Sequence, residues 1–311
     1  MSYLEQFTEI TSLSSVEILN FVKSAPYRYK QYYIPKRSGR GVRLIAQPSK
    51  EVKYMQYIGK QLILDELPVH AAAYAYQKGA SIKANASQHV SNKYLLKMDF
   101  SDFFPSIKPP LLLDVIQSKV GTLSTHDTTL IKRLFFWQRE RISPLQLSIG
   151  APSSPLISNV VMYDFDEFIH AYCSERGINY TRYADDLSFS TNERGLLFHI
   201  PELVSSYLTE NEHLGLSINS GKTKFSSKKH NRHVTGLVLN NENQLSLGRE
   251  RKRKIRTLVF LFSQSALDLD ETYHLKGLLA FALNIEPNFI LRLRSKYSSE
   301  MIYRINLKML A

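Results

Sequence analysis

The sequence is short of the residues and runs on which several classes of protein depend. It holds one cysteine, Cys173, among 311 residues, which excludes a disulfide framework and a zinc site built on cysteines. No apolar run comes near the roughly 18 residues that a membrane-spanning helix requires. The opening residues, MSYLEQFTEI, lack the basic and apolar regions of a signal peptide. We therefore expect a cytoplasmic protein with no membrane partner.

Acidic residues are also few beside the basic ones. The chain has 40 Lys and Arg against 28 Asp and Glu, a formal net charge of +12, and 43% of its residues are hydrophobic. That hydrophobic share supports a sizeable core and excludes wholesale disorder, and the length suits one large domain or about two ordinary ones. The positive charge suggests a polyanionic partner, with nucleic acid favoured, although an evenly solvated basic surface would also account for it.

The basic residues are concentrated in one part of the chain. Between residues 222 and 256, Lys and Arg far outnumber the two acids, Glu242 and Glu250. The densest part opens a predicted helix, where cations oppose the helix dipole and a phosphate backbone would offset their repulsion. A solvated helix start is the alternative. The candidate nucleic-acid-binding residues in this run are Arg249, Arg251, Lys252, Arg253 and Lys254.

Strands and helices are interspersed up to about residue 247, and the remainder is helical by its apolar periodicity. The chain is therefore expected to be α+β, with a domain boundary near residue 247. The predicted helices are 12–24, 50–66, 81–92, 110–119, 127–139, 155–175, 200–213, 249–264, 269–284 and 287–309. The predicted strand is 94–100, and the predicted hairpins are 27–48 with a basic tip at 36–41, 178–190 and 233–247.

Three acids occur where two predicted strand segments end or turn. Asp99 closes an apolar strand, and Asp185 and Asp186 lie in a Tyr-Ala-Asp-Asp turn. Carboxylates that share one pocket must share a proton or bind a cation, and oxygen-only ligands favour Mg²⁺ or Mn²⁺. If Asp99 packs beside the turn, the three acids could hold two divalent ions at a phosphoryl-transfer site. A turn with two solvated aspartates is the alternative.

These segments, in this order, resemble the motifs of reverse transcriptases, and of the retron branch in particular. Asn85 to His89 (NASQH) and Val234 to Gly236 (VTG) are similar to signatures of that branch. The general motifs are matched by 42–48 (VRLIAQP), 99–107 (DFSDFFPSI), 150–155 (GAPSSP), 183–186 (YADD), 215–223 (GLSINSGKT) and 234–240 (VTGLVLN).

The resemblance implies a right-hand polymerase with a ferredoxin-like antiparallel palm sheet and an all-helical C-terminal thumb. The fingers would take residues 1–95 with part of 108–147, the palm 96–247 and the thumb 248–311. A length near 300 residues is expected to leave no room for ribonuclease H, maturase or endonuclease domains.

It also implies the activity. The enzyme would use deoxynucleoside triphosphates to copy a structured non-coding RNA into branched, RNA-linked single-stranded DNA. Synthesis would begin at the 2′-hydroxyl of a guanosine. The expected partners are that cognate RNA, its DNA product and an effector protein of anti-phage defence, in the cytoplasm of a bacterium.

Residue roles carry over by motif position. Asp99, Asp185, Asp186 and the carbonyl of Phe100 would hold two Mg²⁺ ions, with Mn²⁺ as a substitute, and Lys222 would be the general acid for pyrophosphate. Phe104 would be the steric gate against ribonucleotides. The other expected nucleotide contacts are Lys36, Arg43, Ser101, Asp102, Phe103 and Gly150. The expected nucleic-acid contacts outside the basic helix are Asn85, His89, Val234, Thr235 and Gly236.

Simpler interpretations of several of these residues stay open. Lys36 and Arg43 could belong to an ordinary exposed hairpin, Lys222 to a solvated loop, and Asn85 and His89 to a helix cap and the surface. Ile149 stands where the family usually carries Gln before Gly150, which removes one side-chain hydrogen bond to the incoming nucleotide. The alternatives for function are another reverse transcriptase branch, such as the group II intron-like or abortive-infection types, or a non-catalytic RNA-binding or antitoxin subunit.

Overall fold

The computed structural model describes residues 1–36, 39 and 41–307, except for the side chains of residues 306 and 307. Its internal contacts define two compact units. The first unit comprises Met1–Ala80, Leu96–Phe189 and Arg194–Lys224, and the second comprises Ser81–Leu95, Ser190–Glu193 and the chain from Phe225 onward. This division does not follow the expected fingers, palm and thumb boundaries, which stay a prediction.

Helices from distant parts of the chain pack together in the first unit. The group consists of α1 (Tyr3–Thr11), α2 (Ser15–Ser24), α3 (Lys50–Gly59), α6 (Pro109–Val120) and α7 (Thr125–Phe135). Ser14 and Glu17 form the expected capping box of α2, and the Leu4 N–H donates to the Asp127 carboxylate of α7 at 2.9 Å. The predicted helix at 50–66 continues beyond α3 as a π-helical turn, Lys60–Leu64.

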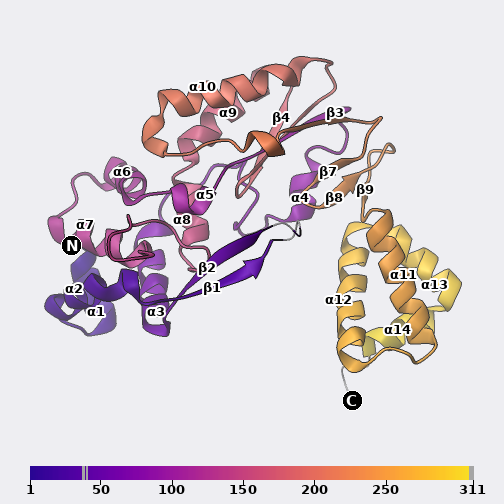
Figure 1. Cartoon of the computed structure of the whole chain (residues 1–311), viewed down its shortest axis with the longest axis horizontal. Coiled ribbons are helices and arrows are strands. Elements are labelled where there is room, and N and C mark those ends of the chain that lie inside the picture. Colours follow the sequence, from indigo (N-terminus) through magenta and orange to yellow (C-terminus); the bar gives the residue numbers. More distant parts are fainter. Residues whose placement is uncertain (37–38, 40, 308–311) are drawn as a thin grey trace. The chain divides into compact units, whose positions relative to one another are not determined.

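The first hairpin forms as predicted. Strands β1 (Tyr29–Pro35) and β2 (Val42–Pro48) pair antiparallel with Pro35 opposite Val42, and Figure 1 shows them as a long ribbon. Three tip residues, Arg37, Ser38 and Arg40, lie outside the described residues. The Ala46 N–H donates to the Ile149 carbonyl at 3.0 Å, so β2 is joined to the segment that precedes Gly150.

A four-stranded sheet has the order β4-β5-β3-β6. Its strands are β3 (Tyr94–Asp99), β4 (Asn179–Tyr183), β5 (Asp186–Thr191) and β6 (Lys224–Ser227), and the predicted hairpin at 178–190 is confirmed as β4 and β5. Helix α9 (Tyr163–Glu175) packs against β4, and the Tyr207 ring of α10 (Ile200–Glu210) contacts the Phe165 and Phe168 rings of α9. The strand ends are thereby held on a helical layer.

The prediction of one helix over 155–175 is wrong. The segment forms α8 (Ser154–Val160) and α9, separated by a turn at Val161 and Met162. The apolar periodicity runs through this break because residues on both sides of it are buried. A pattern of buried residues therefore gave no sign of the turn.

The second unit has its own sheet and core. Strands β7 (Arg232–Val234), β8 (Leu237–Leu239) and β9 (Leu245–Ser246) pair antiparallel, so the predicted hairpin at 233–247 acquires a third strand. Helix α4 (Ile82–Ser87) packs against β7 and β8. Figure 1 shows the helices that follow as one group, α11 (Arg249–Ser263), α12 (Leu269–Ile285), α13 (Pro287–Tyr297) and α14 (Ser299–Leu307).

The expected single helix over 287–309 is also wrong. Ser298 has a φ of +71°, which breaks the chain into α13 and α14, because non-glycine residues in helices keep negative φ values. Residues 308 and 309 of that prediction lie outside the described residues.

Short elements complete the chain. They are α5 (Phe103–Ser106) and the 3-10 turns Ala25–Tyr27, Leu196–His199, Glu212–Leu214 and Ser220–Lys222. No helix in the described part of the chain combines the length and apolar character that crossing a bilayer requires.

The core of the second unit gives a stability prediction. Leu275 of α12 is fully buried, whereas Leu283 of the same helix is 49% exposed. We expect Leu275→Ala to lower the free energy of unfolding by about 2–5 kcal/mol, because it leaves a cavity, and Leu283→Ala to change it by less than about 0.5 kcal/mol. Urea denaturation of the two variants measures the difference, and equal losses would contradict the assigned core.

Candidate active site

The three acids come together because β3 and β5 are neighbours. Asp99 ends β3, Asp185 lies in the turn before β5, and Asp186 begins β5. The Phe100 N–H donates to the Asp185 carbonyl at 3.0 Å, which fixes the end of one strand to the turn before the other. Asp99 is buried, and Asp185 and Asp186 are half-buried.

Burial and neighbouring acids raise the pKa values of Asp185 and Asp186. Burial raises the pKa of Asp185, and the Asp99 charge adds to the effect. Burial raises the pKa of Asp186 to about 6, with further contributions from Asp185 and Asp99, while the Lys97 and Lys222 charges oppose the rise. Ionised carboxylates at this place are therefore costly, and a bound cation would offset that cost.

Lys222 is brought to the acids by the loop that follows α10. The Ser101 N–H donates to the Ser217 carbonyl at 2.8 Å, and the Asn219 N–H to the Asp99 carbonyl at 2.8 Å, which attaches the loop to the end of β3. The Lys222 Nζ then lies 2.7 Å from Asp99 Oδ1. Burial lowers the pKa of Lys222, but the hydrogen bond and the three acidic charges outweigh it and raise the pKa above its ordinary value. The ammonium thus remains charged as the counter-ion of Asp99.

The three acids are suitable ligands for a divalent cation. Asp99, Asp185 and Asp186 offer only oxygen ligands, which suit Mg²⁺ and Mn²⁺. The charges of Asp99 and Asp185 both contribute to the raised pKa of Asp186, which shows that the three lie close together. Among the described residues, no three His, Cys, Asp or Glu side chains already have the arrangement of a metal site. Binding of an ion therefore requires that the carboxylates turn toward it.

The aromatic residues after Asp99 line the same region. Phe103 is buried and its ring stacks on Phe100, with 5.5 Å between ring centroids. Phe104 is half-buried, and its ring lies edge to face with Tyr76, 6.5 Å between centroids. Asp102 is exposed at the start of α5 with a φ of +41°. Phe104 and Asp102 are thus the more accessible of these positions, and Phe103 belongs to the core.

Tyr76 belongs to this region although its sequence gave no signal. It is 52% exposed and has a φ of +63°, a conformation rare for a bulky residue. Burial raises its pKa, the Asp185 charge adds to the rise, and the Arg43 charge opposes it. Arg43 acts on the pKa of Asp185 in the same direction. The structure thus brings Arg43 and Tyr76 within electrostatic reach of the acids.

Two of the expected nucleotide contacts, Gly150 and Lys36, are associated with the β1–β2 hairpin. Gly150 has a φ of +133°, and a Cβ there would stand 2.9 Å from the Ala46 carbonyl oxygen. A side chain at this position would therefore displace the backbone of β2. Lys36 is exposed after β1, and its N–H donates to the Gly41 carbonyl at 3.0 Å.

His89 does not lie at the surface, where the simpler interpretation of its motif placed it. His89 lies beyond the end of α4 and is fully buried, and Asn85 is 1% exposed. His89 Nδ1 is 2.7 Å from Ser190 Oγ, and burial lowers the pKa of His89 to about 3. The imidazole is therefore neutral at pH 7 and forms part of the core of the second unit. The Asn85 amide has no hydrogen-bond partner among the described residues.

The second retron-like motif packs beside the first. Thr235 has a φ of +46°, and its hydroxyl donates to the Ile82 carbonyl of α4 at 3.0 Å. Val234 is fully buried, and Gly236 follows with a φ of +79°. Of the three, Thr235 and Gly236 have the backbone conformation of a tight turn, and Val234 anchors that turn in the core.

The basic start of α11 is partly neutralised within its own unit. Lys252 Nζ lies 2.7 Å from the Glu286 carboxylate, and the Arg251 guanidinium lies over the Phe281 ring at 5.2 Å. Three of the predicted contacts remain exposed, namely Arg249, Arg253 and Lys254. These three are the predicted contacts most accessible to a polyanion.

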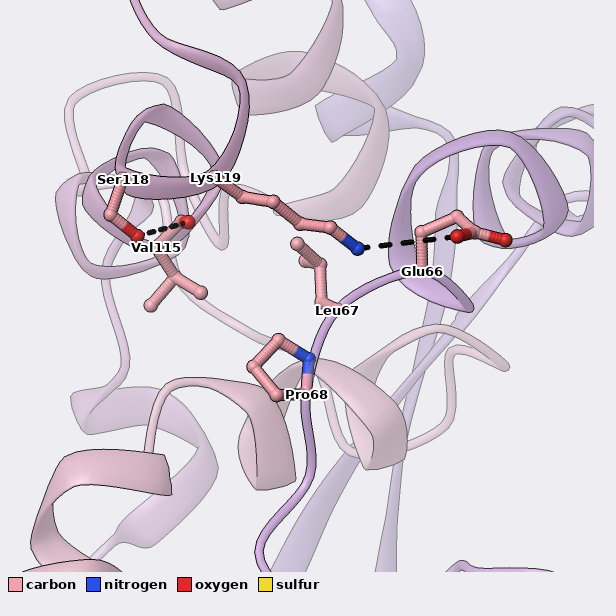
Figure 2. A pocket seen from close by; sticks show the side chains of 6 residues that line it. All are labelled: Glu66, Leu67, Pro68, Val115, Ser118 and Lys119. Carbon is pink, nitrogen blue, oxygen red and sulfur yellow. Dashed lines mark hydrogen bonds and ion pairs between the residues drawn. The ribbon is translucent and has the colours of Figure 1, made fainter.

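A pocket of about 460 Å³ is formed by residues that the sequence did not assign to any site. It is lined by Glu66, Leu67, Pro68, Val115, Ser118 and Lys119. Figure 2 shows the Lys119 ammonium reaching toward Glu66, 4.0 Å from its carboxylate. None of the predicted catalytic, nucleotide or nucleic-acid residues lines it.

Comparisons with known proteins agree with this geometry. The family model described as reverse transcriptase (RNA-dependent DNA polymerase) matches residues 34–239. The chain is 46% identical to the retron Ec83 reverse transcriptase of Escherichia coli, over 91% of this chain and 92% of that protein. It is 35% identical to the retron Ec73 reverse transcriptase of the same species, over 92% of each.

A solved structure shows the same fold. A telomerase from Candida albicans, determined with a fragment of telomeric RNA, matches with a TM-score of 0.50 at 13% identity, over 89% of this chain and 59% of that one. The architecture is thus the α+β right-hand polymerase fold. The chain belongs to the reverse transcriptases, and among them to the retron reverse transcriptases. It is an enzyme, an RNA-directed DNA polymerase, as the sequence motifs predicted.

The raised pKa of Asp186 gives a pH-dependent stability prediction. The folded protein holds this proton more tightly than the unfolded chain, so without metal its stability falls as pH rises from about 4 to about 6. Asp186→Asn removes the ionised group and should stabilise the metal-free protein at pH 7 by about 1–2 kcal/mol, a figure discounted for partial exposure. The advantage should vanish near pH 4.

Denaturant titrations at several pH values in the presence of a chelator measure this effect. Asp114→Asn, at an exposed position of α6, is the matched control and should change stability by less than about 0.5 kcal/mol. A constant advantage for Asp186→Asn from pH 4 to pH 8 would show that the carboxylate is not the cause.

Proposed function

We propose that this enzyme makes branched, RNA-linked single-stranded DNA from a structured non-coding RNA, beginning at a guanosine 2′-hydroxyl. The observation that carries the catalytic part is the meeting of Asp99, Asp185 and Asp186 at adjacent ends of β3 and β5. The retron part is supported by the relatives, which include retron reverse transcriptases from Escherichia coli.

In this proposal the three acids and the Phe100 carbonyl hold two Mg²⁺ ions. Such ions, when bound, increase the acidity of the attacking hydroxyl and stabilise the leaving pyrophosphate. The Lys222 ammonium lies 2.7 Å from Asp99 Oδ1. It would therefore stand close to the leaving group, to which it could donate a proton or a hydrogen bond.

The residues around the acids select and hold the deoxynucleoside triphosphate. Arg43 would contact the triphosphate by charge-assisted hydrogen bonds, assisted by Lys36 of the hairpin and by Ser101 and Asp102 of the motif that begins at Asp99. Gly150 leaves the backbone open to close approach. Phe104 would exclude a ribose 2′-hydroxyl, and the contact with Tyr76 supports this ring in position.

The nucleic-acid partners are the cognate RNA and its DNA product. We assign their contacts to the exposed cations of α11, Arg249, Arg253 and Lys254, and to the turn at Thr235 and Gly236. Asn85, His89 and Val234 would support that surface from the core. We further propose fingers, palm and thumb near the expected boundaries, action in a bacterial cytoplasm, and an effector protein in anti-phage defence.

The catalytic assignment predicts a loss of activity without a loss of binding. Asp185→Asn keeps the side-chain volume and removes a charge, so RNA-templated primer extension should fall about 10³-fold or more, equivalent to ~4 kcal/mol in the barrier. RNA affinity should not fall, because the removed carboxylate has the same sign of charge as the phosphate backbone and does not bind it.

Primer extension and RNA binding by filter retention measure the two quantities, with Asp114→Asn as control. Near-normal extension by Asp185→Asn would refute the assignment. The nucleic acid that copurifies with the wild-type enzyme tests the retron part, since ordinary cellular RNA without linked DNA would contradict it.

The gate assignment predicts a change in sugar selectivity. Phe104→Ala should accept ribonucleotides about tenfold more readily relative to deoxynucleotides, a change of ~1.4 kcal/mol in transition-state binding. Phe104→Tyr retains a bulky ring and is the matched control. Single-nucleotide incorporation kinetics measure both variants, and unchanged selectivity in Phe104→Ala would assign the ring to packing alone.

A further inference from the structure

A buried ion pair contacts the turn at Ala184 and Asp185 that precedes β5. Arg182 of β4 and Asp166 of α9 are both fully buried. The Arg182 Nε donates to Asp166 Oδ1 at 2.8 Å, and the second terminal nitrogen donates to Oδ2 at 2.5 Å. The Tyr180 hydroxyl also donates to Asp166 Oδ1 at 2.7 Å. The carboxylate thus has three donors and no contact with solvent.

The remaining nitrogen of Arg182 reaches the turn itself. It donates to the Ala184 carbonyl at 3.2 Å and to Asn159 Oδ1 of α8 at 3.2 Å. The Asn159 amide in turn donates to the Ala75 carbonyl at 2.8 Å. One guanidinium therefore connects two helices to the residue that precedes the Asp185 and Asp186 pair.

The turn needs such support because of its backbone. Ala184 has a φ of +56°, a left-handed conformation that is unfavourable for any residue with a Cβ. Upstream, the Arg182 N–H donates to the Ala72 carbonyl at 2.8 Å, and the Tyr74 N–H donates to the Arg182 carbonyl at 2.7 Å. The backbone of Arg182 is therefore fixed before Tyr183, and its side chain fixes the Ala184 carbonyl after Tyr183.

Stability alone does not explain a buried pair. An apolar pair of similar volume usually stabilises a core as well as or better than an ion pair does. An apolar pair, however, cannot donate a hydrogen bond to the Ala184 carbonyl. The feature specific to the guanidinium is therefore its contact with the turn.

We propose that Arg182 is a positioning residue that fixes the Ala184 turn so that Asp185 and Asp186 present their carboxylates together to a divalent cation, with Asp166 as its anchor. The proposal rests on the proposed role of these two acids. It adds that metal affinity depends on a side chain that touches neither the metal nor the substrate.

Two variants test the proposal, each with Mn²⁺ as the probe. Arg182→Lys keeps the charge near Asp166 but loses the planar fork that reaches Ala184. The double variant Arg182→Met with Asp166→Leu removes both buried charges and keeps a filled core. We expect both to fold by circular dichroism and to bind Mn²⁺ about tenfold more weakly than wild type, measured on the full chain by electron paramagnetic resonance.

Tyr180→Phe is the matched control. It removes one hydrogen bond to the same carboxylate but leaves the Arg182 contact with Ala184, so its Mn²⁺ affinity should equal that of wild type. The Mg²⁺ concentration for half-maximal primer extension should rise in the two Arg182 variants and stay unchanged in Tyr180→Phe. A purely structural role would affect all three in proportion to their loss of stability.

The outcomes separate this proposal from the function on which it rests. Wild-type Mn²⁺ affinity in a folded Arg182 variant, or failure of both variants to fold, would overturn the positioning role while Asp185→Asn remained inactive. Full activity and full Mn²⁺ binding in Asp185→Asn would instead overturn the catalytic assignment and the positioning role with it.

Discussion

The electrostatic cost of placing three carboxylates at neighbouring strand ends is the constraint on which the rest of this structure depends. Burial and repulsion from the other acids raise the pKa of Asp186 to about 6, so its ionised form is unfavourable in the folded protein. Neighbouring groups hold the acids in place. Lys222 neutralises Asp99, and the Phe100 N–H fixes the Asp185 carbonyl. A bound cation would relieve this cost, as expected of a site in which stability is given up for function.

The second unit shows a different use of polar residues. The Thr235 hydroxyl joins the second retron-like motif to the Ile82 carbonyl of α4, the helix that carries Asn85 of the first motif, but much of each motif is buried. His89 bonds to Ser190, and Arg232 donates to the carbonyls of Asn92 and Asn240. Several residues of the two motifs are therefore buried and support the structure of this unit from its core. Thr235 is half-buried, and the cations Arg249, Arg253 and Lys254 of α11 are exposed.

Much of the fold, the family and its polymerase activity could be predicted from the sequence, because the informative features were local. A tight turn between two apolar strands predicts β4 and β5, and the order of the motifs identifies the family. Other features depend on contacts that no local pattern records. The breaks at Met162 and Ser298 interrupt apolar patterns that continue past them, and the burial of His89 results from packing against distant segments. Tyr76 reaches the site through a left-handed backbone conformation that its residue type disfavours.

The neutral His89 has a consequence for how the enzyme responds to acid. With its pKa lowered to about 3, this imidazole keeps the same protonation state across the whole physiological range, so acidification does not charge the interior of the second unit at this point. The Asp186 carboxylate of the metal-free protein, by contrast, takes up a proton near pH 6. Mild acid should therefore discharge Asp186 in the metal-free protein while the packing around His89 stays intact, and neutralisation should restore the charge.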